Sequence, residues 1–188
     1  MIDPAQVAVL LLAAGRSERF GSDKLLVPLD GVPVALHAAA PLIALGTGWL
    51  IAVCREASPI APELVELGFE IVVNPDPARG LSSSLALGIE RAEALGATAA
   101  LIALGDMPFV SPAHLAVLLA SFDRASAPIV ASARHGVGMP PALFDKALFG
   151  DLRTSEGEQG ARSLIRAAKL VAADPDELAD IDRPEDIR

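Results

Sequence analysis

Three cations follow a run of small residues in the stretch "LLAAGRSERFGSDKLL" near the start of the chain. The small residues at positions 13–15 let a backbone approach a ligand closely, and their N–H groups can face an anion. Arg16, Arg19 and Lys24 then supply positive charge within nine residues. Amides that position an anion, together with cations that stabilise developing charge, are what a bound triphosphate requires. The alternative is a surface turn whose basic residues pair with the chain's many acids.

Two carboxylates stand where a divalent cation could be held. Asp106, in "ALGDMP", follows an apolar run and precedes a proline, so it is either a Mg²⁺ ligand at a strand's carboxyl end or a turn-forming residue. Asp182, in "DIDRPEDI", forms a capping-box pattern with Glu185, with Pro184 in the first turn. The cap is the favoured reading, and the alternative is that Asp180 and Asp182 are further oxygen ligands.

A third polar segment, "NPDPARGLSSSLALG", starts at Asn74. Ser82 is expected to cap the following helix, whose N-terminus can receive an anion or a base edge. Other chemistries lack their patterns. "GLSSS" has no second glycine for a nucleophile elbow, and the first loop has neither the P-loop nor the dinucleotide spacing. The three histidines are far apart, so zinc chemistry has no support.

Alternating apolar runs and helix-like stretches must position these segments. We expect strands at residues 6–14, 49–54, 69–74, 99–106 and 128–134. We expect helices at residues 33–46, 62–68, 81–96, 111–125 and 158–171. This alternation predicts an α/β fold, a three-layer sandwich with a mostly parallel central sheet and helices on both faces. Because ligands of such sheets bind beyond the carboxyl ends of the strands, the three polar segments are expected at one edge.

The composition limits the classes of function. The chain has 188 residues, which suits one domain over residues 1–188, and 52% of them are hydrophobic. A formal net charge of −9 argues against a nucleic-acid partner, and no apolar run is long enough to span a bilayer. Cys54 is the one cysteine, and we expect it to be a packed thiol. These features predict a cytoplasmic protein without a nucleic-acid or membrane partner.

The motifs together resemble the MobA-like nucleotidyltransferases, and among them the molybdenum cofactor cytidylyltransferases. The matching stretches are "LAAGRSERFGSDKLL", "NPDPARGLSSSL", "LGDMPFV", "EGEQGARSLI" and "DIDRPEDI", in family order along nearly the whole chain. "LAAG" rather than "LAGG", together with "NPDPARGLSSSL", resembles the cytidylyl branch. The resemblance implies a Rossmann-like, nucleotide-diphospho-sugar transferase-like fold.

Site roles follow from that resemblance, residue by residue. Arg19 and Lys24 match the catalytic cations, and Asp106 and Asp182 match positions near a Mg²⁺ ion. The nucleotide-binding positions implied are Leu12, Ala13, Ala14, Gly15, Arg16, Lys24, Asn74, Gly80, Ser82, Ser83 and Ser84. The sequence "HGVGMPPALF" departs from the family's Gly-His-Pro turn in the segment that faces the second substrate.

The reaction implied is nucleotidyl transfer from CTP to molybdenum-loaded molybdopterin, with release of pyrophosphate. An ionised phosphate is already nucleophilic, so in-line positioning and charge neutralisation suffice. The alternatives are guanylyl or other nucleotidyl transfer to a phosphorylated acceptor, and a carrier that delivers the cofactor to a client molybdoenzyme without turnover.

Overall fold

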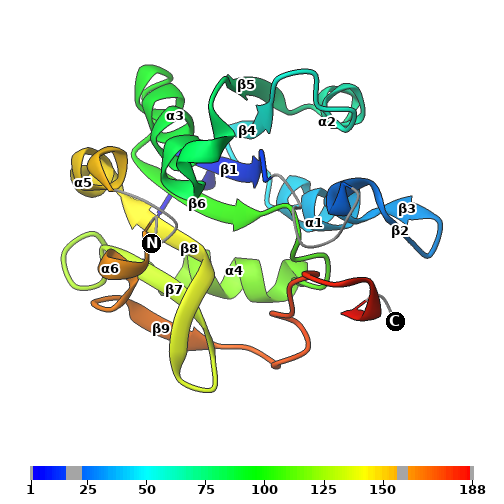
Figure 1. Ribbon diagram of the computed structural model, residues 1–188. Helices are drawn as coiled ribbons and strands as arrows, with labels where there is room; N and C mark the ends of the chain where they lie inside the picture. The colour runs from blue at the N-terminus through cyan, green and yellow to red at the C-terminus, as the bar shows by residue number, and fades with distance from the viewer. Residues whose placement is uncertain (1, 16–22, 156–160, 187–188) are drawn as a thin grey trace.

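The computed structural model describes residues 2–15, 23–155 and 161–186. A seven-stranded mixed sheet lies at the centre of the fold (Figure 1). Arg16 and Arg19 lie outside the described residues. In spatial order the strands are β5 (Glu70–Asn74), β4 (Trp49–Arg55), β1 (Val7–Ala13), β6 (Ala99–Leu104), β8 (Val137–Asp145), β7 (Ile129–Arg134) and β9 (Lys169–Ala172). The hairpin β2 (Pro28–Leu29) and β3 (Val32–Pro33) precedes the first helix.

The described helices cover both faces of this sheet (Figure 1). They are α1 (Val34–Ile43), α2 (Ala61–Glu66), α3 (Leu81–Ala94), α4 (Pro112–Ser121), α5 (Phe149–Thr154) and α6 (Arg162–Ile165). Helices α1, α2 and α4 pack on one face, and α3, α5 and α6 pack on the other. None of these helices is long and apolar enough to cross a membrane. The layered α/β architecture expected from the alternating pattern is confirmed.

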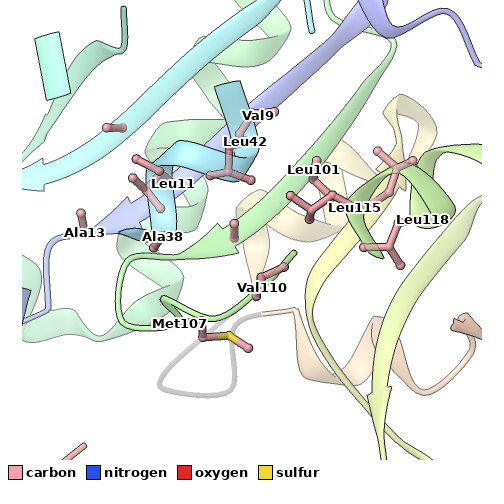
Figure 2. Packing of buried hydrophobic residues seen from close by; sticks show 14 of the residues in the cluster. Val9, Leu11, Ala13, Ala38, Leu42, Leu101, Met107, Val110, Leu115 and Leu118 are labelled. Carbon is pink, nitrogen blue, oxygen red and sulfur yellow. The ribbon is translucent and has the colours of Figure 1, made fainter. Parts of the chain in front are cut away.

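Strand β1 lies at the centre and is buried at every position. It pairs in parallel with β4 and β6, and a strand covered on both faces needs apolar residues throughout. Its successive side chains point to opposite faces: Val9 and Leu11 pack under α1, whereas Leu10 packs under α3. Figure 2 shows the first of these cores, with Leu42 of α1 and Leu115 of α4 among the packed side chains. Apolar cores therefore enclose β1 on both faces up to its carboxyl end.

The order of the strands reverses at β1, because the chain goes from β1 outward to β4 and β5 and then returns to β6 on the other side. The first crossovers use helices α1 and α2 on one face, and the return uses α3 on the opposite face. In open α/β sheets this arrangement leaves a crevice outside the carboxyl ends of the strands, where ligands bind. The switch point here lies between β1 and β6.

Strand β8 is not among the strands expected from the sequence, and two adjacent prolines lie within it. Its pairing with β7 shifts register there: Ala131 faces Ala142, but the next residue of β7, Ser132, faces Met139. The intervening Pro140 and Pro141 fall in the irregularity, where a missing N–H costs no ladder hydrogen bond. β8 runs antiparallel to both neighbours, so the sheet is mostly, not wholly, parallel.

The helix expected at residues 158–171 is wrong at its end. Residues 156–160 lie outside the described part, and helix α6 covers only Arg162–Ile165. Residues Lys169–Ala172 form strand β9, which pairs in parallel with β7. Helix-compatible residues adopt strand geometry there because the open edge of β7 supplies hydrogen bonds that outweigh a weak local preference.

Candidate functional site

The carboxyl ends of four parallel strands meet at one edge of the sheet. The register pairs Ala13 of β1 with Cys54 of β4, and Arg55 of β4 with Asn74 of β5. On the other side of β1, Leu12 pairs with Leu104 of β6. The loops that follow β1, β5 and β6 therefore leave the sheet at the same edge, as the sequence predicts.

Lys24 enters the site on a short 3₁₀ turn, Lys24–Leu26, in the segment that follows β1. Asp23 caps the turn, because its Oδ1 accepts a hydrogen bond from the Leu25 N–H at 3.2 Å. The Leu25 side chain is buried and lies against Gly105, at the end of β6. The turn is thus fixed on the core side, and Lys24 points across the end of β6.

The Lys24 ammonium lies between two carboxylates from distant parts of the chain. Its Nζ is 2.6 Å from Asp106 Oδ2 and 2.9 Å from Asp182 Oδ1. The lysine side chain is only 14% exposed. Burial by itself would lower the pKa of Lys24, but Asp106 and Asp182 outweigh it and raise the pKa above the ordinary value. The ammonium therefore stays charged at neutral pH.

Close packing of Gly105 on β1 places Asp106 beside the carboxyl end of that strand. The Gly105 N–H donates to the carbonyl oxygen of Leu12 at 3.0 Å, and a Cβ at Gly105 would stand 3.3 Å from that same oxygen. Glycine lets the end of β6 approach the end of β1 this closely. The second carboxylate oxygen of Asp106, Oδ1, is buried and accepts no hydrogen bond from a described residue.

The carboxyl-terminal segment brings Asp182 to the site (red in Figure 1). The Ile181 N–H donates to the backbone oxygen of Asp106 at 2.9 Å, and the side chains of Ile181 and Leu178 are fully buried. Burial, and then the nearby charges of Asp182 and Asp106, raise the pKa of Asp180. Several carboxylates therefore face one ammonium at this edge.

The capping box expected at Asp182 and Glu185 is replaced by a different contact. The N–H groups of Asp182 and Arg183 donate to Asp186 Oδ2, at 2.9 and 2.8 Å. The carboxylate that accepts is therefore Asp186, one residue beyond Glu185, because the turn begins at Pro184 and Asp186 is its third residue. The side chain of Asp182 turns to Lys24 instead.

The donor set at Asp106 and Asp182 fits a hard divalent cation. Both offer carboxylate oxygens, and Asp106 Oδ1 has none of its hydrogen-bonding capacity used by a described residue. Across the described ranges there is no cluster of three or more His, Cys, Asp or Glu side chains arranged to hold a metal. Mg²⁺ commonly takes only one or two carboxylates and completes its shell with waters and substrate phosphates. Asp106 and Asp182 supply that number of carboxylates, so the residues present fit such an ion.

A second cluster braces the segment after β5. The buried Asn74 donates from Nδ2 to the hydroxyl oxygens of Ser83 and Ser84, each at 2.9 Å, and its Oδ1 accepts from the Asp76 N–H at 2.9 Å. Ser83 donates its own proton to the Gly80 oxygen at 2.8 Å. These bonds fix the loop against the first turn of α3.

The cap expected at Ser82 is wrong. Helix α3 starts at Leu81, and Gly80 is its N-cap residue, with φ of +87° and no side-chain cap. That left-handed backbone suits glycine, so the N-cap position falls at Gly80, two residues before Ser82. Ser82 is buried inside the first turn.

The remaining expected residues lie at the end of β1, in the part of the chain that is not described, and at the end of β4. Leu12, Ala13 and Ala14 are buried at the end of β1, and Gly15 is exposed beside them. Arg16 and Arg19, expected to bind phosphate, are outside the part of the chain that the structure describes. Cys54 is fully buried, as expected for a packed thiol, and burial raises its pKa to about 11.

Two charged residues of this edge were missed by sequence reasoning. Asp23 Oδ2 accepts a hydrogen bond from Nη2 of Arg55 at 2.7 Å, which ties the Lys24 turn to the end of β4. The signals available were an aspartate directly before a lysine and an arginine that ends an apolar run. Neither pattern is distinctive alone.

Comparison with known proteins agrees with this geometry. The family model described as MobA-like NTP transferase domain matches residues 9–173. The purine catabolism protein PucB of Bacillus subtilis (strain 168) is 29% identical, covering 94% of this chain and 92% of its own. The molybdenum cofactor guanylyltransferase of Burkholderia vietnamiensis (strain G4 / LMG 22486) is 32% identical, covering 87% of this chain and 78% of its own. The solved structure of a nucleotidyl transferase from Methanothermobacter thermautotroptrophicus has a TM-score of 0.77 at 28% identity, covering 96% of this chain and 94% of that one.

Proposed function

The chain belongs to the MobA-like NTP transferase family and is a nucleotidyltransferase, and from that premise we propose that it transfers CMP from CTP to molybdenum-loaded molybdopterin. An oxygen of the molybdopterin phosphate attacks the α-phosphorus of CTP. The bond from that phosphorus to the oxygen bridging to the β-phosphate breaks, and pyrophosphate leaves. The observation that carries the proposal is the Lys24 ammonium held at the switch point of the sheet, 2.6 Å from Asp106.

Lys24 is the group that we assign to the triphosphate. A largely buried, charged ammonium at this edge can stabilise the negative charge that develops on the phosphate oxygens during transfer. Its carboxylate partners keep it charged and aimed before the nucleotide arrives. Arg19 is proposed to act on the same charge.

Asp106 and Asp182 are proposed to hold Mg²⁺ when the nucleotide is bound. The ion would neutralise charge on the phosphate oxygens and help to orient them. The two carboxylates contribute oxygens from the end of β6 and from the carboxyl-terminal segment, and the Ile181–Asp106 hydrogen bond keeps those backbones together.

The base is proposed to lie against the segment from Asn74 to Ser84, beside the end of β1. The Asn74 amide uses both its Nδ2 and its Oδ1 in hydrogen bonds within that segment, and the Ser83 hydroxyl donates to the Gly80 oxygen. We therefore assign recognition of the nucleotide base to the backbone groups of this segment. The serine hydroxyls hold that backbone in place. A site that hydrogen-bonds its substrate rejects analogues that leave its polar groups unpaired.

Guanylyl transfer is the competing candidate, because the Burkholderia vietnamiensis relative is a molybdenum cofactor guanylyltransferase. The experiment that separates the two measures pyrophosphate release with CTP, GTP, ATP or UTP, Mg²⁺ and molybdenum-loaded molybdopterin. We expect the highest kcat/KM with CTP and no release without acceptor. A preference for GTP would replace the cytidylyl assignment, and binding of the acceptor without turnover of any nucleotide would point to a carrier.

A further inference from the structure

Asp23 divides its two carboxylate oxygens between the backbone and a side chain. Oδ1 caps the 3₁₀ turn through the Leu25 N–H, and Oδ2 accepts from Arg55 Nη2 at 2.7 Å. Arg55 is the last residue of β4, and its side chain is one-third exposed, whereas Asp23 is largely buried. One carboxylate therefore joins the turn that follows β1 to the neighbouring strand end.

The residue that follows Asp23 is Lys24. A lysine side chain has four flexible carbons, so the position of its ammonium depends on the position of the Cα atom that carries it. Leu25 holds one side of the turn in the core, and the Asp23–Arg55 pair holds the other. Removing the pair takes away the contact that joins Asp23 to the end of β4.

We propose that Arg55, acting through Asp23, is a positioning residue that aims Lys24 at the reacting phosphates. This inference rests on the proposed nucleotidyl transfer. Arg55 suits the role because its guanidinium is rigid and always charged, so it holds the Asp23 carboxylate in a fixed direction at any physiological pH. A displacement of about 1 Å can cost a reaction about a hundredfold, so a partial loosening of the turn has a measurable cost.

The chain offers a matched control for the loss of an ion pair. Arg91 forms a two-pronged pair with Glu70, at 2.6 and 3.1 Å. Glu70 is the first residue of β5, so this pair lies toward the amino ends of the strands, at the edge opposite the site. Arg91→Ala removes an arginine and an ion pair without touching the Lys24 turn.

The first measurement is a double-mutant cycle on kcat. We expect Arg55→Ala to lower kcat by about tenfold or more in the wild-type background and to change it less than twofold in the Lys24→Ala background. Arg91→Ala should leave kcat unchanged. Equal losses from Arg55→Ala in both backgrounds would overturn the proposal, because Arg55 would then act independently of Lys24.

The second measurement observes Lys24 without turnover. In protein carrying lysine labelled with ¹³C at Cε, the Lys24 resonance is assigned by its absence in Lys24→Ala, and Lys146 and Lys169 serve as references. We expect this resonance to shift in Arg55→Ala and to stay in place in Arg91→Ala. An unmoved resonance would overturn the proposal whatever happens to kcat.

The two measurements distinguish failure of the proposed nucleotidyl transfer from failure of the positioning role of Arg55. If wild-type protein releases no pyrophosphate with any nucleotide while the Lys24 resonance moves in Arg55→Ala, the proposed function fails and the positioning contact stands. If Arg55→Ala does not fold, Asp23→Asn takes its place, because the amide keeps an oxygen for the Leu25 N–H but loses the charge that binds Arg55. The same two readouts and the same contrary results then apply.

Discussion

The Nζ atom of Lys24 lies 2.6 Å from Oδ2 of Asp106. This ion pair joins the turn that follows β1 to the loop that follows β6. Both residues are mostly buried, so solvent screens the pair less than it would at the surface. The contact lies at the switch point of the sheet, which is where open α/β sheets generally bind their ligands.

Asp106→Asn should abolish most of the turnover and leave the fold in place. The amide keeps an oxygen near Lys24 but removes the negative charge that both the ammonium and a divalent cation require. We expect kcat to fall by about a hundredfold or more, on the scale of losing one preorganised electrostatic group. Steady-state kinetics beside a melting curve measures this, with exposed Asp151→Asn as the control. Turnover near the wild-type rate would remove Asp106 from the site.

Lys24→Met should lower kcat by about a hundredfold while it keeps an apolar stem of similar length. The change also leaves Asp106 and Asp182 without the ammonium that joins them. Because a ligand that binds only the folded state stabilises it, Mn²⁺ should raise the Tm of this variant more than that of wild type. An equal Tm increase in both proteins would show that Lys24 and the cation do not share these carboxylates. Arg19→Ala is expected to lose kcat similarly.

Asp182→Asn should retain its fold and need more Mg²⁺ for half-maximal rate. The backbone bond of Ile181 to Asp106 does not depend on the Asp182 side chain, so the segment stays docked and Tm should change by only a few degrees. The amide oxygen is a poorer ligand than a carboxylate for a hard cation. A Mg²⁺ titration of the rate measures the shift. The same titration curve as wild type would leave Asp106 as the one carboxylate assigned to the metal.

His114 should make the protein lose stability as the pH falls. Its Nε2 lies 2.8 Å from Ser132 Oγ, and that hydroxyl donates its own proton to the Pro141 oxygen, so the neutral ring donates to Ser132. Burial lowers the pKa of His114, partly opposed by Glu177. The unfolded chain therefore binds the proton more readily, and stability is complete above the unfolded pKa of about 6.5 and declines as pH drops below it toward the folded pKa.

The test compares unfolding free energies at pH 7.5 and pH 5. His114→Gln should show a smaller loss between the two values than wild type does, whereas exposed His135→Asn should show the wild-type loss. An undiminished loss in His114→Gln would assign the acid sensitivity to other groups.

The position of the site could be predicted because it depends on local patterns. The continuous apolar run of β1 indicates a doubly covered strand, and polar residues directly after such strands must gather at one edge. That reasoning places Lys24 and Asp106 at the same edge before any contact is known. It also gives the crossover helices, because helix-like stretches separate the apolar runs.

The features that were missed depend on contacts between distant segments. The local pattern around Asp182 favours a capping box, but the burial of Ile181 and its bond to Asp106 direct the Asp182 carboxylate to Lys24. The prolines of β8 argue against a strand until the register shift of β7 accommodates them. The Asp23–Arg55 pair joins the segment after β1 to the end of β4. No spacing in the sequence indicates that these two residues are in contact.

The most direct test of nucleotidyl transfer follows the fate of each phosphate. The protein is incubated with Mg²⁺, molybdenum-loaded molybdopterin and CTP labelled with ³²P at either the α or the γ position, and the products are separated. We expect the α label to move to the molybdopterin product and the γ label to leave as pyrophosphate, with both rates lower by about a hundredfold or more in Asp106→Asn. Release of the γ label as inorganic phosphate, with the α label remaining in CDP, would contradict nucleotidyl transfer.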